Sequence, residues 1–500
     1  MDLRERAARG VFWTAVQNWG ASLVSLAITL VLARMLAPEA FGLLALASAF
    51  IAFMGIFLEQ GLGQAIVQRV EVTAAHLDTA FWMQLTGGIV LTGVAVAAAG
   101  PFTWLYQTFV DPTQASLVGQ LTPMIRWLSL GFLVGALGGT QGAILQRRFA
   151  FKALAIRRLA ASVAGGAVGI AMAARGWGVW SLVGQSLTSS VVGVVVLWRA
   201  SEWRPGRSVS RRCVADLWSF GVNVTGIEVL NFVNRRSDDL LIGWFLGPVA
   251  LGYYTLAYGL LLQMTQILTR TVSSVALPTF SRLQGKPDQM RHAFLTATRL
   301  TSFVAFPAFL GLAAVASELV PVVFGSRWLP SVPVVQVLAF IGLLHSVEYF
   351  TPAILMAAGR PSWVLGVALL NAVTNLTAFI TAVRWGIVAV ALAYVIRGWV
   401  FSPILPYLVR RLIGLPWRRY LGQYVAPLIG CSVMVAAVLA SKAALAERIG
   451  LRGVLAVDIL LGAAVYGLTI LWIAPGLYRE ALELLRLAVV GGARKEERPS

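Results

Sequence analysis

The sequence predicts an all-α integral membrane protein, a polytopic transmembrane helical bundle that crosses the bilayer about 14 times. The chain has 500 residues, of which 58% are hydrophobic and only 12% are charged. A soluble domain carries roughly 25% charged residues, because its surface must be hydrated. Long apolar runs recur from Val11 to Trp472, and about 20 apolar residues are enough to cross the hydrocarbon core as a helix.

The expected spans are the apolar runs between short segments rich in Arg, Pro and Gly. They cover residues 12–33, 41–66, 80–105, 121–145, 153–174, 177–198, 217–246, 252–278, 294–321, 332–357, 363–383, 386–408, 421–441 and 454–474. The first run follows three arginines, as a signal peptide would. It is too long for a signal core and has no small-residue cleavage site after it, so we interpret it as a permanent span.

The formal net charge of +19 reflects membrane topology rather than a nucleic-acid partner. If the N-terminus is cytoplasmic, most Lys and Arg residues fall in cytoplasmic segments, including Arg147 and Arg148 in one segment and Arg204 and Arg207 in another. This positive-inside bias predicts a multi-pass membrane protein with both termini in the cytoplasm. Anionic membrane lipids are therefore expected partners, and nucleic acid is not.

An internal repeat predicts two related halves. Aligning Pro38 with Pro248 also matches identical residues at Leu36 and Leu246, Ala40 and Ala250, and Gly42 and Gly252. The two copies are separated by an even number of predicted spans, so the halves have the same orientation and are related by an axis along the membrane normal. The expected organisation is an N-terminal six-helix lobe at 1–212, a C-terminal six-helix lobe at 213–412, and two extra transmembrane helices with a cytoplasmic tail at 413–500.

Ionisable side chains inside the predicted spans mark the candidate site. A charge in hydrocarbon costs about 2.5–3.5 kcal/mol and usually faces a cavity or a partner. The candidate substrate-binding residues are Arg270, Arg235, Arg397 and Arg126, and the possible ion-coupling residues are Glu59, Glu348, His345 and Asp239. Arg270 has no acid within four residues. Its charge must be met by another span, by water, by an anionic ligand, or by the inner headgroups.

Structural pairing is the alternative for several of these residues. Arg235 could pair with Asp238 or Asp239 along one helix face, and Arg236 with the two aspartates could form an internally neutralised cluster. Pairs between Glu59 and Arg270, or between Glu348 and Arg397, are equally open. The sequence does not choose between these pairs and cavity-facing roles.

The sequence contains no signature of an enzyme, a metal site or a cofactor. Cys213 and Cys431 lie far apart, so neither a disulfide framework nor a zinc site is implied. His76, His292 and His345 are also widely separated, and no phosphate-binding loop or dinucleotide motif is present. We therefore expect no catalytic residues, no cofactor and no enzymatic activity.

Several short motifs resemble the bacterial polysaccharide flippases. They are Gly10-Val11-Phe12-Trp13-Thr14, Leu32-Ala33-Arg34-Met35-Leu36-Ala37-Pro38-Glu39-Ala40-Phe41-Gly42-Leu43, Gly61-Leu62-Gly63-Gln64-Ala65-Ile66-Val67-Gln68, Asp239-Leu240-Leu241-Ile242-Gly243, Leu246-Gly247, Leu251-Gly252-Tyr253-Tyr254 and Pro278-Thr279-Phe280-Ser281-Arg282-Leu283. The resemblance covers roughly residues 10–410. The chain is similar to Wzx-type exporters of the multidrug/oligosaccharidyl-lipid/polysaccharide (MOP) exporter superfamily.

The resemblance implies a twelve-span core of two six-helix lobes with two additional helices. It implies a flippase that moves undecaprenyl-diphosphate-linked oligosaccharide repeat units to the periplasmic leaflet by alternating access, for O-antigen, capsule or exopolysaccharide synthesis. The lipid-linked oligosaccharide would be its substrate, and a polysaccharide polymerase or the export machinery would be a possible partner. Arginine side chains suit such a substrate, because guanidinium groups bind phosphate oxygens bidentately.

Two other classes of function stay open from the sequence. Another exporter of the same superfamily is one, either a peptidoglycan-precursor flippase or a drug/cation antiporter. A cation exporter would need acidic cavity residues, whereas Arg270 is a cation without an acid close by in sequence. A membrane-embedded polysaccharide polymerase or ligase is the other. Such enzymes commonly carry catalytic groups on a large outer loop, and none of the predicted outer loops is long.

Overall fold

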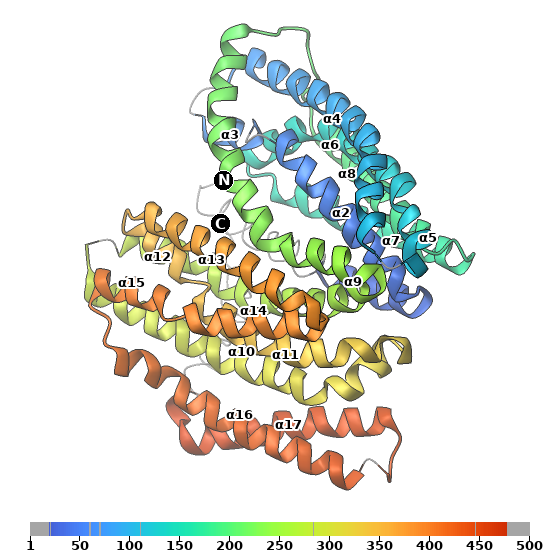
Figure 1. Ribbon diagram of the computed structural model, residues 1–500. Helices are drawn as coiled ribbons and strands as arrows, with labels where there is room; N and C mark the ends of the chain where they lie inside the picture. Colours follow the sequence, from blue (N-terminus) through green and yellow to red (C-terminus); the bar gives the residue numbers. More distant parts are fainter. Residues whose placement is uncertain are drawn as a thin grey trace, which may run out of the picture. The chain divides into compact units, whose positions relative to one another are not determined.

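The computed structural model describes residues 20–477 apart from residues 21, 60–61, 70–71, 111, 284 and 446. Within helices, the side chains of residues 59, 62, 64, 68, 212, 215–225, 227, 269–279 and 281–282 are also outside the described set. The regular structure of the described residues consists of α-helices and short 3-10 turns, with no strand among them (Figure 1). This confirms the all-α prediction.

Contacts between residues divide the chain into two compact units. The first unit comprises Met1–Leu256 and Ala368–Ala393, and the second comprises Ala257–Val367 and Tyr394–Ser500. Helices α9 (Arg211–Arg282), α13 (Pro361–Ala382) and α14 (Ile387–Phe401) each contribute to both units. The lobe boundaries expected near residues 212 and 412 stay a prediction.

The first unit is built from long helices packed in pairs. Besides its parts of α9, α13 and α14, it contains α2 (Pro38–Glu59), α3 (Leu62–Gln68), α4 (Ala74–Phe109), η1 (Pro112–Gln114), α5 (Ala115–Gly119), α6 (Leu121–Arg147), α7 (Phe151–Ala174) and α8 (Trp180–Ala200). Helix α4 packs on α6, and α7 packs on α8. Glycine allows the second pair to approach closely, because a Cβ on Gly165 would lie 2.6 Å from the carbonyl oxygen of Gln185.

The second unit contains the C-terminal helices. Besides its parts of α9, α13 and α14, it holds α10 (Pro287–Val323), η2 (Ser326–Ser331), α11 (Val332–Glu348), α12 (Thr351–Ala357), α15 (Ile404–Ile413), α16 (Trp417–Leu445) and α17 (Leu451–Ile473). Helix α10 contacts α11, α16 and α17, and α16 packs along α17. The two extra helices of the prediction are therefore α16 and α17, and α10 anchors them.

Twelve helices of the described residues are long and apolar enough to cross a membrane. Two differences separate this number from the fourteen predicted spans. Residues 12–19 and 21 of the predicted span at 12–33 lie outside the described residues, and the rest of this span falls largely in a shorter apolar helix, Ser22–Met35. The predicted seventh and eighth spans are two helices on either side of Gly247, whose φ is 83° and ψ is 174°, and the number twelve counts them together as the stretch Glu228–Leu268.

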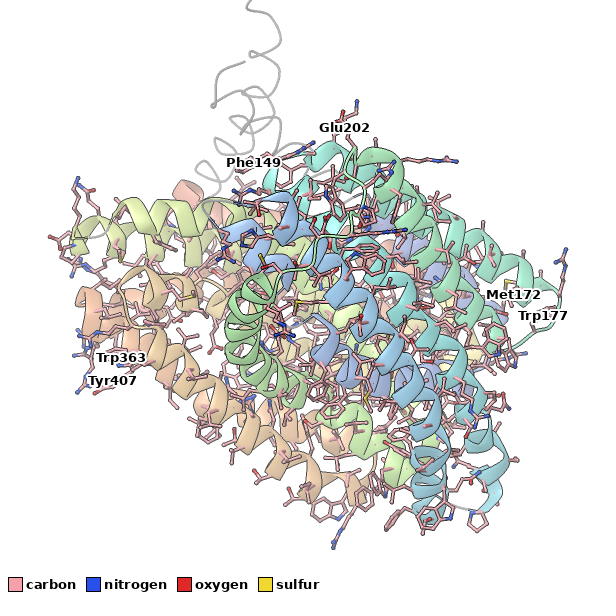
Figure 2. All side chains as sticks on the ribbon, turned by 90° about the horizontal axis from the view of Figure 1, so that it is seen from above. Phe149, Met172, Trp177, Glu202, Trp363 and Tyr407 are labelled. Atoms are coloured by element: carbon pink, nitrogen blue, oxygen red, sulfur yellow. The ribbon has the colours of Figure 1, made fainter. Side chains whose placement is uncertain are left out.

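Exposed aromatic side chains lie beyond the two ends of α7, as expected for a helix that crosses a membrane. Phe149 precedes the helix and is 70% exposed, and Trp177 follows it and is 56% exposed. Figure 2 shows both side chains at the edge of the ribbon. A helix of 24 residues is about 36 Å long, so its ends reach the interfaces of a core roughly 30 Å thick, where aromatic rings concentrate.

The two copies of the repeated Pro-x-Ala-x-Gly motif contact each other in the first unit. A Cβ on Gly42 would lie 1.7 Å from the carbonyl oxygen of Pro248, and a Cβ on Gly252 would lie 2.0 Å from the carbonyl oxygen of Pro38. The contact is reciprocal, as the repeat alignment predicts for a pair related by an approximate twofold axis. Both obstructing atoms belong to the backbone, so a side chain at either glycine would force the helices apart.

We predict that Gly42→Ala and Gly252→Ala each destabilise the protein by about 1–3 kcal/mol, the usual cost of overpacking. Thermal unfolding of the purified protein in detergent measures the effect. Gly93→Ala is the matched control, because Gly93 lies within α4 and has no atom within 4 Å of the new Cβ. Unfolding temperatures that are equal for Gly42→Ala and Gly93→Ala would show that the crossing is not tight.

Candidate functional site

Arg236, Asp238 and Asp239 form a paired cluster on α9 within the first unit. The Arg236 guanidinium donates to Asp239 Oδ2 at 2.9 Å. The Tyr254 hydroxyl donates to Asp238 Oδ2 at 2.8 Å, and the Asp239 backbone N–H donates to Asp238 Oδ1 at 3.0 Å. Both aspartates are buried, so this network satisfies carboxylates that water does not reach. Asp239, a possible ion-coupling residue, thus has an ion-pair partner in this structure.

Arg235 lies next to this cluster but does not join it. Its side chain is exposed, and among the described residues it has no ion-pair or hydrogen-bond partner. The pairs with Asp238 or Asp239 that the sequence left open do not form, because Tyr254 and Arg236 bind those carboxylates.

The depth of Arg235 in its span makes its exposure informative. It precedes the break at Gly247 by about twelve residues, or about 18 Å of helix. It also lies seven residues after Glu228, where the apolar stretch Glu228–Leu268 begins, so Arg235 lies within the span and not at its end. An unpaired guanidinium at such a depth requires water or an anionic ligand.

An amide pair connects α9 with α13 beside the same cluster. Asn375 Nδ2 donates to Asn234 Oδ1 at 2.6 Å, and Asn375 is only 2% exposed. The sequence analysis gave no role in the site to Asn375 or to Tyr254, which it named only within a family motif. Single polar side chains in apolar helices resemble ordinary packing residues in a sequence, and only their partners reveal their role.

The second unit brings together three predicted residues from two helices. His345 and Glu348 lie one turn apart on α11, and Tyr394 and Arg397 lie one turn apart on α14, so each pair projects from one face of its helix. His345 Nε2 is 3.4 Å from the Tyr394 hydroxyl oxygen. The Arg397 guanidinium carbon is 5.8 Å from the centre of the Tyr394 ring. Tyr394, which sequence reasoning missed, links the two predicted groups.

Glu348 and Arg397 interact by charge without a close ion pair. The charge of Arg397 acts on Glu348, but Glu348 has no salt bridge or hydrogen bond among the described residues. Its Oε1 atom is buried without a partner. The ion pair between Glu348 and Arg397 that the sequence left open therefore does not form, and the Glu348 carboxylate can accept another cation.

The remaining predicted residues are Arg126, Arg270 and Glu59. Arg126 is exposed on the second turn of α6, beside Trp127, which is 54% exposed; this position near a helix end lets its guanidinium reach the interface. Arg270 lies in α9 and Glu59 ends α2. The side chains of both residues fall outside the described set.

A fold of long apolar helices with charged side chains inside its spans is that of a multi-pass membrane protein. Residues 31–333 match the model of the polysaccharide biosynthesis protein family, and the chain belongs to that family. This confirms the resemblance found in the sequence.

Relatives and solved structures agree with this assignment. The chain is 27% identical to the lipopolysaccharide biosynthesis protein WzxC of Escherichia coli, over 84% of each chain. It is 27% identical to the succinoglycan biosynthesis transport protein ExoT of Rhizobium meliloti, over 73% of this chain and 72% of ExoT. The fold is similar to that of the lipid II flippase MurJ, with a TM-score of 0.76 at 13% identity, covering 94% of this chain and 100% of MurJ. The fold is also similar to that of an inward-facing multidrug resistance MATE family transporter of the MOP superfamily, with a TM-score of 0.60 at 16% identity, covering 79% of this chain and 98% of that chain.

We predict that Arg236→Gln lowers stability by up to about 3 kcal/mol. The change leaves Asp239 buried without its partner, and breaking a fully buried pair costs about 3–5 kcal/mol; the side chain of Arg236 is 40% exposed, which reduces the loss. Arg235→Gln is the matched control and should leave stability nearly unchanged. Thermal unfolding in detergent compares the two variants, and equal losses would contradict the pairing described above.

Proposed function

We propose that this protein is a flippase for undecaprenyl-diphosphate-linked oligosaccharide repeat units, which it translocates across the bacterial cytoplasmic membrane for O-antigen, capsule or exopolysaccharide synthesis. Membership of the polysaccharide biosynthesis family supports the class of pathway. The likeness to transporters supports alternating access rather than catalysis. In this proposal both termini are cytoplasmic, and the partners are the lipid-linked substrate, membrane lipids, and a polysaccharide polymerase or export machinery.

The observation that carries the proposal is the exposed guanidinium of Arg235, within its span and without a partner among the described residues. A diphosphate headgroup is too strongly charged to cross hydrocarbon unaided. A guanidinium fixed at that depth replaces water around the phosphate oxygens with bidentate hydrogen bonds. The sugars would travel in water beside it, while the polyprenyl chain stays in the lipid.

The other candidate arginines would assist at different stages of the passage. Arg126, near the end of α6, is placed to meet the headgroup at one interface. Arg397 supplies a cation within the second unit, and its charge acts on Glu348. Arg270 retains its proposed role on the grounds given by the sequence.

We assign ion coupling in this proposal to Glu348 and His345. Glu348 is mostly buried beside Arg397 and has an oxygen without a hydrogen-bond partner. Uptake of a proton or a sodium ion there would change the balance of charge around Arg397. To couple an ion to a substrate, a transporter that alternates between two states must bind the ion with different affinity in the two states. Asp239 and Glu59 are the other candidates for this role.

A peptidoglycan-precursor flippase is the second candidate function, favoured by the fold similarity to the lipid II flippase MurJ. The phosphate chemistry required of Arg235 is the same for both lipid-linked substrates. The two functions differ in the glycan, so the identity of the lipid that accumulates when the protein is removed distinguishes them.

We predict that Arg235→Gln reduces export about tenfold or more, because a charge-assisted hydrogen bond contributes about 1.5–3 kcal/mol and 1.4 kcal/mol corresponds to a factor of ten. Arg235→Lys should recover only part of the activity, since lysine keeps the charge but loses the bidentate geometry. The measurement is the amount of lipid-linked oligosaccharide in each leaflet of spheroplasts.

The matched control is Arg175→Gln, because Arg175 is an exposed arginine outside the spans, between α7 and α8. Removal of the protein should leave substrate in the cytoplasmic leaflet, and wild type should restore its export. Full restoration by Arg235→Gln would remove Arg235 from the site but leave the function intact. Accumulation in the periplasmic leaflet would instead favour a polymerase or ligase.

We also predict that Glu348→Gln separates transport from its driving ion. In inside-out membrane vesicles, substrate movement by wild type should accelerate when a proton or sodium gradient is imposed, and the variant should not respond. Slow movement without a gradient should persist in both proteins. A gradient response that survives in Glu348→Gln would transfer the coupling role to Asp239 or Glu59.

A further inference from the structure

A second buried acid lies far along the chain from the proposed transport residues, where α17 packs on α16 and α10 in the second unit. The buried stripe of α17 contains Val454, Leu455, Asp458, Gly462, Tyr466 and Ile470. Asp458 is the single acid in this stripe and is 1% exposed. Neither of its carboxylate oxygens has a hydrogen-bond partner among the described residues.

The register of α17 on α16 places Asp458 opposite Ser441 and Lys442. A Cβ on Gly462 would lie 3.3 Å from Val438 Cγ2. Helices α16 and α17 are antiparallel neighbours. The turn of α17 that precedes Gly462 contains Asp458, and it lies at the level of the turn of α16 that follows Val438, which contains Ser441 and Lys442. The Ser441 hydroxyl is buried and, like Asp458, lacks a partner.

The packing of α17 on α10 places Asp458 at the level of Ala314 on α10. The Tyr466 hydroxyl donates to the carbonyl of Phe303 at 2.7 Å. Asp458 lies two turns before Tyr466 on α17, which corresponds to the part of α10 two to three turns beyond Phe303. There Lys442 donates to the carbonyl of Ala314 at 2.5 Å. Three helices therefore contribute polar groups at one level.

The ammonium of Lys442 is already used at this level. It forms an ion pair with Glu318, and it also donates to the Ser317 hydroxyl at 3.1 Å. The side chains of Lys442 and Glu318 are only 15% and 12% exposed. Lys442 thus balances Glu318, and Asp458 has no counter-charge of its own.

Among the described residues, the charged groups at this level are two acids, Glu318 and Asp458, and one base, Lys442, which leaves one negative charge. Arg452 of α17 and Glu447 and Arg448 of the following turn are exposed toward the helix ends. Cys431 and Tyr466 lie about two turns further along the packed helices. An unbalanced charge is strongly disfavoured in a buried membrane environment.

We propose that Asp458 binds one monovalent cation, a sodium ion or a proton, with the Ser441 hydroxyl as its neighbouring oxygen. A sodium ion would take oxygens from both side chains. A proton would neutralise the carboxyl group. In either form the layer of Glu318, Lys442 and Asp458 becomes neutral, and the site is separate from Glu348.

The test uses the full-length protein in nanodiscs and two readouts that do not depend on transport. The first is the shift in unfolding temperature when sodium replaces choline at constant ionic strength, because a ligand that binds the folded state stabilises it by mass action. The second is the infrared carbonyl band of a protonated carboxyl group. A sodium site gives a temperature shift in wild type that Asp458→Asn abolishes. A proton site gives a carboxyl band that the same variant removes.

Two further variants test the charge balance itself. Glu318→Gln should abolish either response although Asp458 is retained, because Lys442 then becomes available to balance Asp458. Glu447→Gln removes an exposed acid close to the same helix pair and should leave the response as in wild type. If Asp458→Asn does not fold, Glu318→Gln carries the test alone. The proposal is overturned if wild type and Asp458→Asn are alike in both readouts, or if Glu318→Gln keeps the full response.

Discussion

The absence of water in the bilayer core is the constraint on which the rest of this structure depends. Every backbone polar group in a span must be satisfied within the span, which leaves the helix as the available form for these segments. Charged side chains face the same constraint. Some meet it in pairs, as Arg236 does with Asp239 and Lys442 with Glu318. Arg235 and Asp458 have no such partner among the described residues, and these are the two residues for which we propose a partner from outside the chain.

The two adjacent arginines Arg235 and Arg236 have different surroundings. Successive side chains on a helix project about 100° apart, so Arg236 reaches Asp239 while Arg235 is exposed. One guanidinium stabilises the helix and the other is available for an anionic headgroup. The same distinction separates Glu318, paired with Lys442, from Asp458. Burial alone therefore does not assign a role to a charge in this protein, and the decisive property is whether a partner is present.

The repeated glycines connect the sequence to the architecture. Gly42 and Gly252 occupy equivalent positions in the two copies, and each lies against the proline carbonyl of the other copy. A duplicated motif that packs against its own duplicate needs both glycines, because each copy supplies the obstacle that the other must avoid. The break of α9 at Gly247 follows from the same motif, since it precedes Pro248 as Ala37 precedes Pro38.

The sequence by itself determined the class of the fold, the apolar spans and the family, since hydropathy over about 20 residues and short turn motifs are local properties. It also identified His345, Glu348 and Arg397 as unusual, because an ionisable residue stands out in an apolar run. Only the tertiary structure decided which charges pair. In it, Tyr394 lies beside His345 and Arg236 forms an ion pair with Asp239. Asp458 is buried without a counter-charge among the described residues. Pairing depends on the register between helices distant in sequence, and hydropathy carries no information about that register.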